Sequence, residues 1–365
     1  MIKAFVLLLS LNLFFVAAQE SNADAFFAIG DNGKAGYIDA AGKQLIKPQF
    51  DEVREFSEGL AAVRAGDSWG YIDKSGKFII SPKFFSAGRF SGDLALISEN
   101  RKYGYIDKTG KIVIPAVFQR ADDFFEGLAR ISSSGRWKFI GKDGKQTFPN
   151  DFLYAENFYQ GFAVVAEKFE PEGVRVSYID KSGKLAPVGW LNYAGNFSEN
   201  LAVISKDKNM QASIGKYGLV FDNVDYKIIK ILDIQYEVID SSGKKMFEIT
   251  SESLGDFHDG LAAACRNRKC GYIDNKGRIA IDFRFDAAED FSEGLAQVKI
   301  DGENFVIDKN GKEVFKVETT IIKPFNYGLA KMINCQDAFC KISYVTATGK
   351  IIWQGSIEKQ SFMFF

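Results

Sequence analysis

Short apolar runs alternate with polar turn residues along most of the chain. In one representative stretch the apolar runs occupy residues 60–63, 69–73 and 78–80, and Gly, Asp and Ser separate them. Runs of this length that are rich in Val, Ile, Tyr and Phe are typical of β-strands. None is long enough, or periodic at 3.6 residues, to indicate a helix. The pattern therefore predicts three short antiparallel strands per stretch.

The stretch recurs at a nearly fixed period. The first residue of its Tyr-Ile-Asp motif falls at Tyr37, Tyr71, Tyr105, Phe139, Tyr178, Val238, Tyr272, Val306 and Tyr344. Most steps are 34 residues, two are 39 and 38, and one is 60. A second marker of the general form Phe-x-x-Gly-Leu-Ala begins at Phe56, Phe90, Phe124, Phe158, Phe197, Phe257, Phe291 and Phe325, and it keeps the same spacing. Two markers in step indicate a repeat architecture.

The segment after each Tyr-Ile-Asp motif predicts a tight hairpin turn. An Asp side chain at its start can accept a hydrogen bond from the backbone two residues on, and a Gly supplies the positive φ. The same turn is expected at Asp73/Gly76, Asp107/Gly110, Asp180/Gly183, Asp274/Gly277 and Asp308/Gly311. Proline follows the third strand at Pro48, Pro82 and Pro115, which marks a strand end or an edge strand.

A single unit is too small to bury its own apolar face, so neighbouring copies have to stack. The sequence therefore predicts an all-β fold of about nine tandem units, each a three-stranded antiparallel sheet. An open or superhelical array is favoured, because nine units exceed the usual 4–8 blades of a propeller and the 60-residue step interrupts regular closure. A closed β-propeller is the alternative.

The repeat resembles the WG-repeat family, bacterial proteins with tandem β units of about this length. The resemblance covers residues 26–353 and is carried by residues 69–73 with Gly76-Lys77, 103–107 with Gly110-Lys111, and 270–274 with Gly277-Arg278. The literal Trp-Gly pair occurs only at Trp69-Gly70. The Trp position elsewhere holds Ala35, Tyr103, Trp137, Val176, Tyr236, Cys270, Asn304 and Ile342, as expected of a packing position. The resemblance implies no common enzymatic activity.

The chain divides into four segments. Residues 1–18 predict a secretory signal peptide, with Lys3 before a short apolar run and small residues near position 18; the alternative is a membrane-anchored N-terminus. Residues 19–204 and 238–365 form two repeat arrays. Residues 205–237 are interpreted as a hairpin insert, or as a tenth, eroded repeat. We expect an exported protein, periplasmic or extracellular, with no membrane span in the mature chain.

Four cysteines in two pairs predict two disulfides. Cys265 and Cys270, like Cys335 and Cys340, flank the loop between the first and second strands of a unit. A four-residue loop places its flanking residues opposite each other, close to disulfide reach. An oxidising compartment favours the bond. The rival interpretation, a four-cysteine metal site, fits this spacing poorly, and no metal site is predicted.

No catalytic constellation is recognisable, so we expect no enzyme and no cofactor. His258 is the only histidine, and it occupies a slot that varies between repeats, which indicates a solvent-facing residue. A Ser-His-Asp triad would depend on His258 alone. The repeated aspartates are explained by their turns. A formal net charge of −1 over 365 residues gives no sign of a nucleic-acid partner.

Three aromatic residues suggest a binding surface. Trp69, Tyr103 and Trp137 occupy one slot at intervals of 34 residues, and stacked units could align them into a stripe. Exposed rings would stack on sugars or accept peptide side chains, whereas buried rings would belong to the core between repeats. We expect a secreted, non-enzymatic scaffold for a protein or peptide partner. A module that binds cell-envelope glycans is the alternative, and it requires exposed rings.

Overall fold

The structure is a computed structural model. It describes residues 25–31, 33–169, 173–208, 210–214, 219–222, 224–225, 230–231, 233–317, 321–336 and 339–358, and every structural statement below concerns these residues. The predicted signal peptide, residues 1–18, lies outside them. All regular elements in this part of the chain are β-strands.

The described residues form ten antiparallel sheets. Nine of them follow one another along the chain, and we number them as blades 1 to 9; the tenth, with two strands, belongs to the insert. Blade 1 comprises β1 (Phe27–Asp31), β2 (Lys34–Ile38) and β3 (Gln44–Phe50). Blade 2 comprises β4 (Glu52–Val53), β5 (Ala61–Ala65), β6 (Ser68–Ile72) and β7 (Phe78–Phe84). Blade 3 comprises β8 (Ser86–Ser91), β9 (Leu94–Glu99), β10 (Lys102–Ile106) and β11 (Ile112–Phe118). Blade 4 comprises β12 (Arg120–Ala121), β13 (Ala129–Ser133) and β14 (Arg136–Ile140). Blade 5 comprises β15 (Tyr154–Ala155), β16 (Phe162–Phe169) and β17 (Gly173–Asp180). Blade 6 comprises β18 (Tyr193–Ala194), β19 (Leu201–Ser205), β24 (Ile234–Asp240) and β25 (Lys245–Ser251). Blade 7 comprises β26 (Ser253–Leu254), β27 (Leu261–Arg266), β28 (Lys269–Asp274) and β29 (Ile279–Phe285). Blade 8 comprises β30 (Ala287–Ala288), β31 (Leu295–Ile300), β32 (Glu303–Asp308) and β33 (Glu313–Val317). Blade 9 comprises β34 (Ile321–Ile322), β35 (Leu329–Gln336), β36 (Phe339–Thr346) and β37 (Ile351–Glu358).

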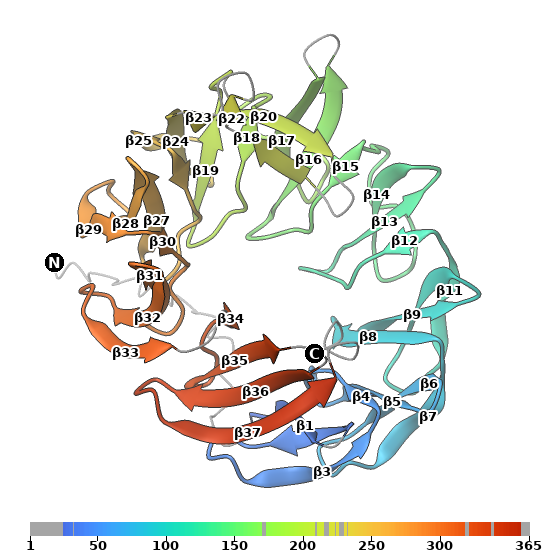
Figure 1. Ribbon diagram of the computed structural model, residues 1–365. Helices are drawn as coiled ribbons and strands as arrows, with labels where there is room; N and C mark the ends of the chain where they lie inside the picture. Colours follow the sequence, from blue (N-terminus) through green and yellow to red (C-terminus); the bar gives the residue numbers. More distant parts are fainter. Residues whose placement is uncertain are drawn as a thin grey trace, which may run out of the picture.

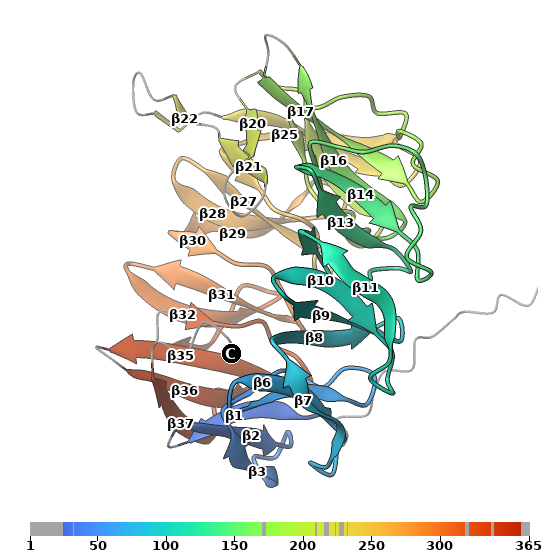
Figure 2. The ribbon, with the colours of Figure 1, turned by 90° about the vertical axis from the view of Figure 1, so that its right-hand side faces the viewer.

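The blades form a closed ring, with β37 of the last blade beside β1 of the first (Figure 1; Figure 2). The all-β repeat is confirmed, and its arrangement is the closed propeller, not the favoured open array. Most blades also have four strands where three were expected. The extra strand lies nearest the centre of the ring and in most blades is only two residues long, such as β4, so it leaves no pattern in the sequence.

The turn glycines show that the last junction repeats the others. A Cβ atom on Gly76 would lie 3.3 Å from the Ile46 side chain in the outer strand of the preceding blade, and one on Gly110 would lie 3.0 Å from Ile80. At the junction of blades 9 and 1, Gly42 stands in the same relation to the backbone of Ile352, at 2.7 Å. The nine units therefore complete a circle.

Hydrogen bonds from tyrosine side chains join neighbouring blades. Where the motif begins with Tyr, its hydroxyl donates to a backbone carbonyl in or just after the inner strand of the next blade. The pairs are Tyr37 to Arg54 (2.6 Å), Tyr71 to Gly88 (2.9 Å), Tyr105 to Asp122 (2.7 Å), Tyr178 to Gly195 (2.5 Å) and Tyr272 to Glu289 (2.7 Å). Tyr344 closes the ring by donating to Ala28 of β1 at 2.8 Å. These tyrosines form the core between blades.

The glycine of the Trp-Gly pair permits a bulge in the outer strand. Between β6 and β7 the register runs from Trp69–Phe84 to Tyr71–Ile80, so the outer strand carries two extra residues. A Cβ atom on Gly70 would lie 2.5 Å from the Ile80 carbonyl oxygen. Pro82 lies in this bulge on the edge strand, where a missing N–H costs no ladder bond.

The insert interrupts blade 6 and does not divide the ring. Its flanking strands, β19 and β24, pair with each other. Within it, β20 (Gln211–Ile214) pairs with β17 of blade 5 and with β21 (Leu219–Asp222), while β22 (Val224–Asp225) pairs with β23 (Lys230–Ile231). The added strands extend a neighbouring blade, which is why the 60-residue step does not prevent closure.

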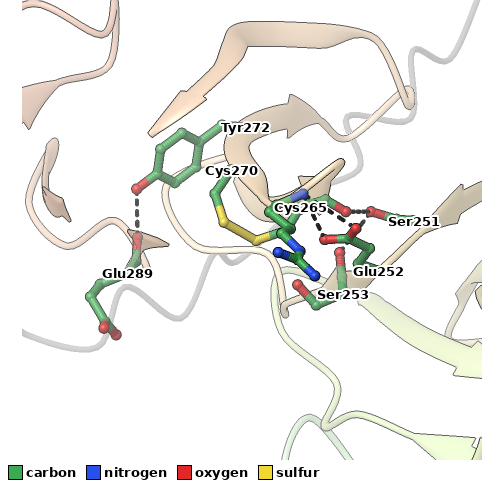
Figure 3. The surroundings of a disulfide bond; sticks show 8 residues. Ser251, Glu252, Ser253, Cys265, Cys270, Tyr272 and Glu289 are labelled. Atoms are coloured by element: carbon green, nitrogen blue, oxygen red, sulfur yellow. Dashed lines mark hydrogen bonds between the residues drawn. A yellow bond between two sulfur atoms is a disulfide. The ribbon is translucent and has the colours of Figure 1, made fainter. Parts of the chain in front are cut away.

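Both predicted cysteine pairs form disulfides. Cys265 lies directly opposite Cys270, with 4.0 Å between their Cα atoms, and Cys335 opposite Cys340, with 3.9 Å. Figure 3 shows the first bond beside Ser251, whose hydroxyl donates to the Cys265 carbonyl oxygen at 2.6 Å. The predicted turns also form as expected: Asp73 Oδ1 accepts from the Ser75 backbone N–H at 2.9 Å.

Removing the hydroxyl of Tyr344 is expected to weaken the last junction. The Tyr344→Phe variant should lose about 1 kcal/mol of unfolding free energy, because the Ala28 carbonyl oxygen loses its side-chain donor. Tyr71→Phe, which breaks the equivalent bond within the ring, should cost a similar amount, and Tyr159→Phe on an exposed ring should cost nothing. Urea denaturation of the three variants tests this. An unchanged midpoint for Tyr344→Phe beside a lowered one for Tyr71→Phe would contradict closure through this bond.

Candidate functional site

The two residues directly before the Phe of the second marker lie at the inner edge of the ring. In most blades they follow the inner strand, and in blade 3 they lie within β8. We call them the inner pairs: Arg54-Glu55, Gly88-Arg89, Asp122-Asp123, Glu156-Asn157, Gly195-Asn196, Gly255-Asp256, Glu289-Asp290 and Lys323-Pro324. In five of them the backbone carbonyl of the first residue accepts a tyrosine hydroxyl, which fixes where the pair stands. Their side chains differ from blade to blade.

Inner pairs of blades 2 to 5 line a cavity of about 510 Å³, which we call the inner groove. Phe125 adds an aromatic ring to a charged and polar lining of Arg54, Glu55, Ser86, Arg89, Asp122, Asp123 and Asn157. A second cavity of about 540 Å³ shares Glu55 and Arg89 with it and reaches Lys323, Lys331 and Tyr344 of blade 9. The two cavities together run along the inner edge from blade 9 to blade 5.

The two arginines of the inner groove are held by aromatic rings. The Arg54 guanidinium lies 5.1 Å from the centre of the Trp69 ring, and that of Arg89 lies 5.6 Å from the centre of Phe125. Arg89 also forms an ion pair with Asp123, with 3.3 Å between Nε and Oδ2. Such cation–π contacts restrain a guanidinium without using its N–H donors, which remain available to a ligand.

The acidic residues of the groove are less easily ionised than usual. Burial raises the pKa of Asp123, against the opposing effect of Arg89. Burial also raises the pKa of Glu55, although more than a third of the residue is exposed, because protein surrounds this position on several sides. Lys331 opposes that rise, and burial lowers the pKa of Lys331 itself. The groove is thus a partly desolvated site in which opposite charges face each other.

A second group of charges occupies the inner edge at blades 7 and 8. Burial and the neighbouring Asp290 raise the pKa of Asp256 to about 6, while His258 lowers it. His258 Nε2 lies 3.6 Å from Asp290 Oδ2, and its side chain is 42% exposed. The slot of His258 does have a role in other repeats, since Ser57 Oγ in that slot donates to the Phe90 carbonyl oxygen at 2.6 Å.

The aromatic stripe predicted from the sequence does not form a sugar-binding face. Trp69 is 5% exposed, Trp137 is 8% exposed, and Tyr103 is half-buried. Arg54 covers Trp69, and the Arg130 guanidinium lies 4.8 Å from the centre of Trp137. Stacking on sugars requires exposed rings, and the two tryptophans are buried. Their position in the repeat faces the neighbouring blade.

Sequence reasoning missed the inner pairs. A signal was available: these two positions stand at a fixed distance before each marker Phe, yet they vary among Arg, Lys, Asp, Glu, Asn and Gly. Variation of charged residues at a fixed place in a repeat is typical of a recognition surface. The described residues contain no group of three or more His, Cys, Asp or Glu side chains placed to hold a metal ion. They also contain no helix that could cross a bilayer.

The raised pKa of Asp256 predicts a pH-dependent effect of its removal. Because its pKa is higher in the fold than in the unfolded chain, the native state loses stability as pH rises from about 4 to above 6. Asp256→Asn should therefore raise the unfolding free energy by up to about 3 kcal/mol at pH 7.5 and by little at pH 4. Thermal unfolding across this range measures it. Asp290→Asn, with Asp256 in place, should weaken the dependence of the unfolding free energy on pH, because it removes one cause of the raised pKa of Asp256. If Asp256→Asn raised the unfolding free energy equally at both pH values, the raised pKa of Asp256 would be contradicted.

Comparisons with known proteins agree with this architecture. The family model described as "WG containing repeat" matches residues 36–68, 69–103, 103–137, 238–270 and 271–303. A search of curated proteins finds no relative. Among solved structures, a eukaryotic initiation factor is similar over 92% of this chain and 96% of its own, with 12% identity and a TM-score of 0.59. The dihydro-heme d1 dehydrogenase NirN matches over 93% of this chain and 74% of its own, with 12% identity and a TM-score of 0.45.

These likenesses to solved structures concern the fold alone. The match to the family model is more specific than these structural likenesses. Its five segments lie on both sides of the insert and follow the period of the blades. A propeller of such repeats suits a scaffold for protein interaction. The chain belongs to the WG-repeat family.

Proposed function

We propose that this protein is an exported, non-enzymatic scaffold that binds a protein or peptide partner in the inner groove. The observation that carries the proposal is the groove itself. Seven charged or polar side chains of four successive blades converge on one cavity of about 510 Å³. Pockets of about 300–1000 Å³ with a few convergent polar groups are typical binding sites.

The way the groove is built favours binding. Each inner pair lies in or directly after an inner strand, and the backbone carbonyls of Arg54, Gly88 and Asp122 accept a tyrosine hydroxyl of the preceding blade. Rigid backbone positions limit the entropy that a site loses when a partner binds. Polar and charged lining groups suit the backbone and termini of a peptide, which present both donors and acceptors.

Two features support export. The disulfides Cys265–Cys270 and Cys335–Cys340 are typical of proteins in an oxidising compartment. The first 18 residues have the charge and apolar pattern of a signal peptide. Cell fractionation tests this part separately: recovery of the full-length, uncleaved chain in the cytoplasm would contradict it.

Site-specific crosslinking in the producing cells tests the binding site. A photoreactive amino acid at Glu55, in the groove, should yield adducts with one or a few partner proteins. The same group at Ile79, on an outer strand and 48% exposed, should yield none of them, although it is equally accessible to reagents. Adducts that form equally at both positions, or only at Ile79, would place the partner elsewhere. A glycan array run on the purified chain provides the second arm, and specific glycan binding would overturn the protein-partner assignment.

A further inference from the structure

Two buried polar atoms in the lining of the inner groove have no hydrogen-bond partner among the described residues. One is Nε of Arg54, a donor on a cation, and the other is Oδ1 of Asn157, a neutral acceptor. Both residues line the same cavity. A buried polar group without a partner has lost its hydrogen bonds to water and gained none in return, which is unfavourable. A ligand that supplies an anionic acceptor to Arg54 and an N–H donor to Asn157 would recover that cost.

Charged and neutral polar side chains occupy successive parts of the groove. Arg54 and Arg89 come from blades 2 and 3, while Asp122 and Asp123 come from blade 4 and Asn157 from blade 5. Two arginines, with Glu55 beside Arg54, are therefore followed along the ring by two aspartates and then by a neutral amide. We call these the cationic, anionic and neutral parts of the groove. Arg89 forms an ion pair with Asp123, and the charge of Arg54 also acts on Asp123 without a direct contact. Arg54 is the cation whose charge is held in place by an aromatic face instead of a carboxylate.

This division excludes simple ions as the preferred ligand. A phosphate or a polyphosphate chain placed at Arg54 would meet Asp122, Asp123 and Glu55 in the same cavity, and like charges in a partly desolvated site repel strongly. A divalent cation placed at Asp122 and Asp123 would meet Arg54 and Arg89. The complementary ligand carries a carboxylate and, within the length of the cavity, N–H donors.

We propose that the inner groove binds the C-terminal end of a peptide chain. The terminal carboxylate accepts from the Arg54 guanidinium, and N–H groups of the preceding residues donate toward Asn157 and the carboxylates of blade 4. A cavity of about 510 Å³ is larger than one amino acid needs, so it holds the last few residues of the chain. This inference rests on the proposed function, because it names the part of the partner that the same groove recognises.

Equilibrium dialysis of the full mature chain against peptide pools tests the inference. Three pools of randomised hexapeptides differ only at their ends: free acid, C-terminal amide, and N-acetylated free acid. Mass spectrometry of the retained peptides should show at least tenfold stronger retention of both free-acid pools than of the amide pool. Equal retention of the free acids and the amides would overturn the proposal. So would an amide pool enriched in Asp and Glu, since side-chain carboxylates would then be the ligand.

Variants locate the recognition in the groove. Arg54→Gln should abolish the preference for free acids over amides, whereas Asn157→Ala should weaken retention severalfold and leave the preference intact. Arg278→Gln, on a hairpin where the side chain is 71% exposed, is the matched control and should change nothing. The comparison of free acid with amide on the unaltered chain needs no variant, so a folding defect in Arg54→Gln does not decide the outcome.

The two proposals fail in different ways. If Glu55 crosslinks a partner in cells but the pools are retained equally, the groove binds a protein through another part and only chain-end recognition is wrong. If neither crosslinking nor dialysis gives a signal, the proposed function itself is wrong. Retention of free acids that persists unchanged in Arg54→Gln would show chain-end binding outside the groove, and would overturn the site.

Discussion

A side-chain hydrogen bond across each junction between blades is the constraint on which the ring depends. The inner strand of most blades is only two residues long, as in β4 and β12, so its own ladder cannot fix its position. The tyrosine of the preceding blade supplies the missing bond, as Tyr105 does by donating to the Asp122 carbonyl oxygen at 2.7 Å. In an interior closed to water, an unpaired carbonyl would be costly. The inner edge of one blade is therefore positioned by its neighbour.

Junctions without a tyrosine use another donor. Phe139, Val238 and Val306 occupy the tyrosine position of blades 4, 6 and 8 and have no hydroxyl. In blades 6 and 8 a serine of the turn bonds the next blade, with Ser198 donating to the Phe257 carbonyl oxygen at 2.5 Å and Ser292 to that of Phe325 at 2.7 Å. The same serine bond accompanies the tyrosine bond at the junction of blades 2 and 3, where Ser57 donates to Phe90. In blade 4 the Arg130 guanidinium donates to the carbonyl oxygen of Ala155. Every junction thus keeps a bond from a side chain to the next backbone, although no single residue type is required.

The sequence predicted what is local and missed what depends on distant segments. The Asp73 turn and the Cys265–Cys270 bond are properties of five or six consecutive residues, so their pattern is visible in the chain itself. Closure depends on the angle between blades, which is set where Gly42 meets Ile352, residues more than 300 positions apart. Two-residue inner strands show no periodicity, so the fourth strand found in most blades was not expected. The aromatic slot was predicted as a possible surface, but whether a ring is buried depends on the blade beside it.

In the inner pairs, the backbone and the side chain of one residue have different roles: the backbone holds the ring together, and the side chain lines the groove. At Arg54 and Asp122 the backbone carbonyl serves the junction, while the side chain lines the groove. Because a carbonyl is present whatever the side chain, these positions can change type without loss of the bond between blades. The repeat therefore keeps Tyr and Phe at positions that hold the ring, and differs at the inner pairs. A closed ring brings successive inner pairs to one edge, so a groove with distinct cationic and anionic parts can be built from repeats that share one scaffold.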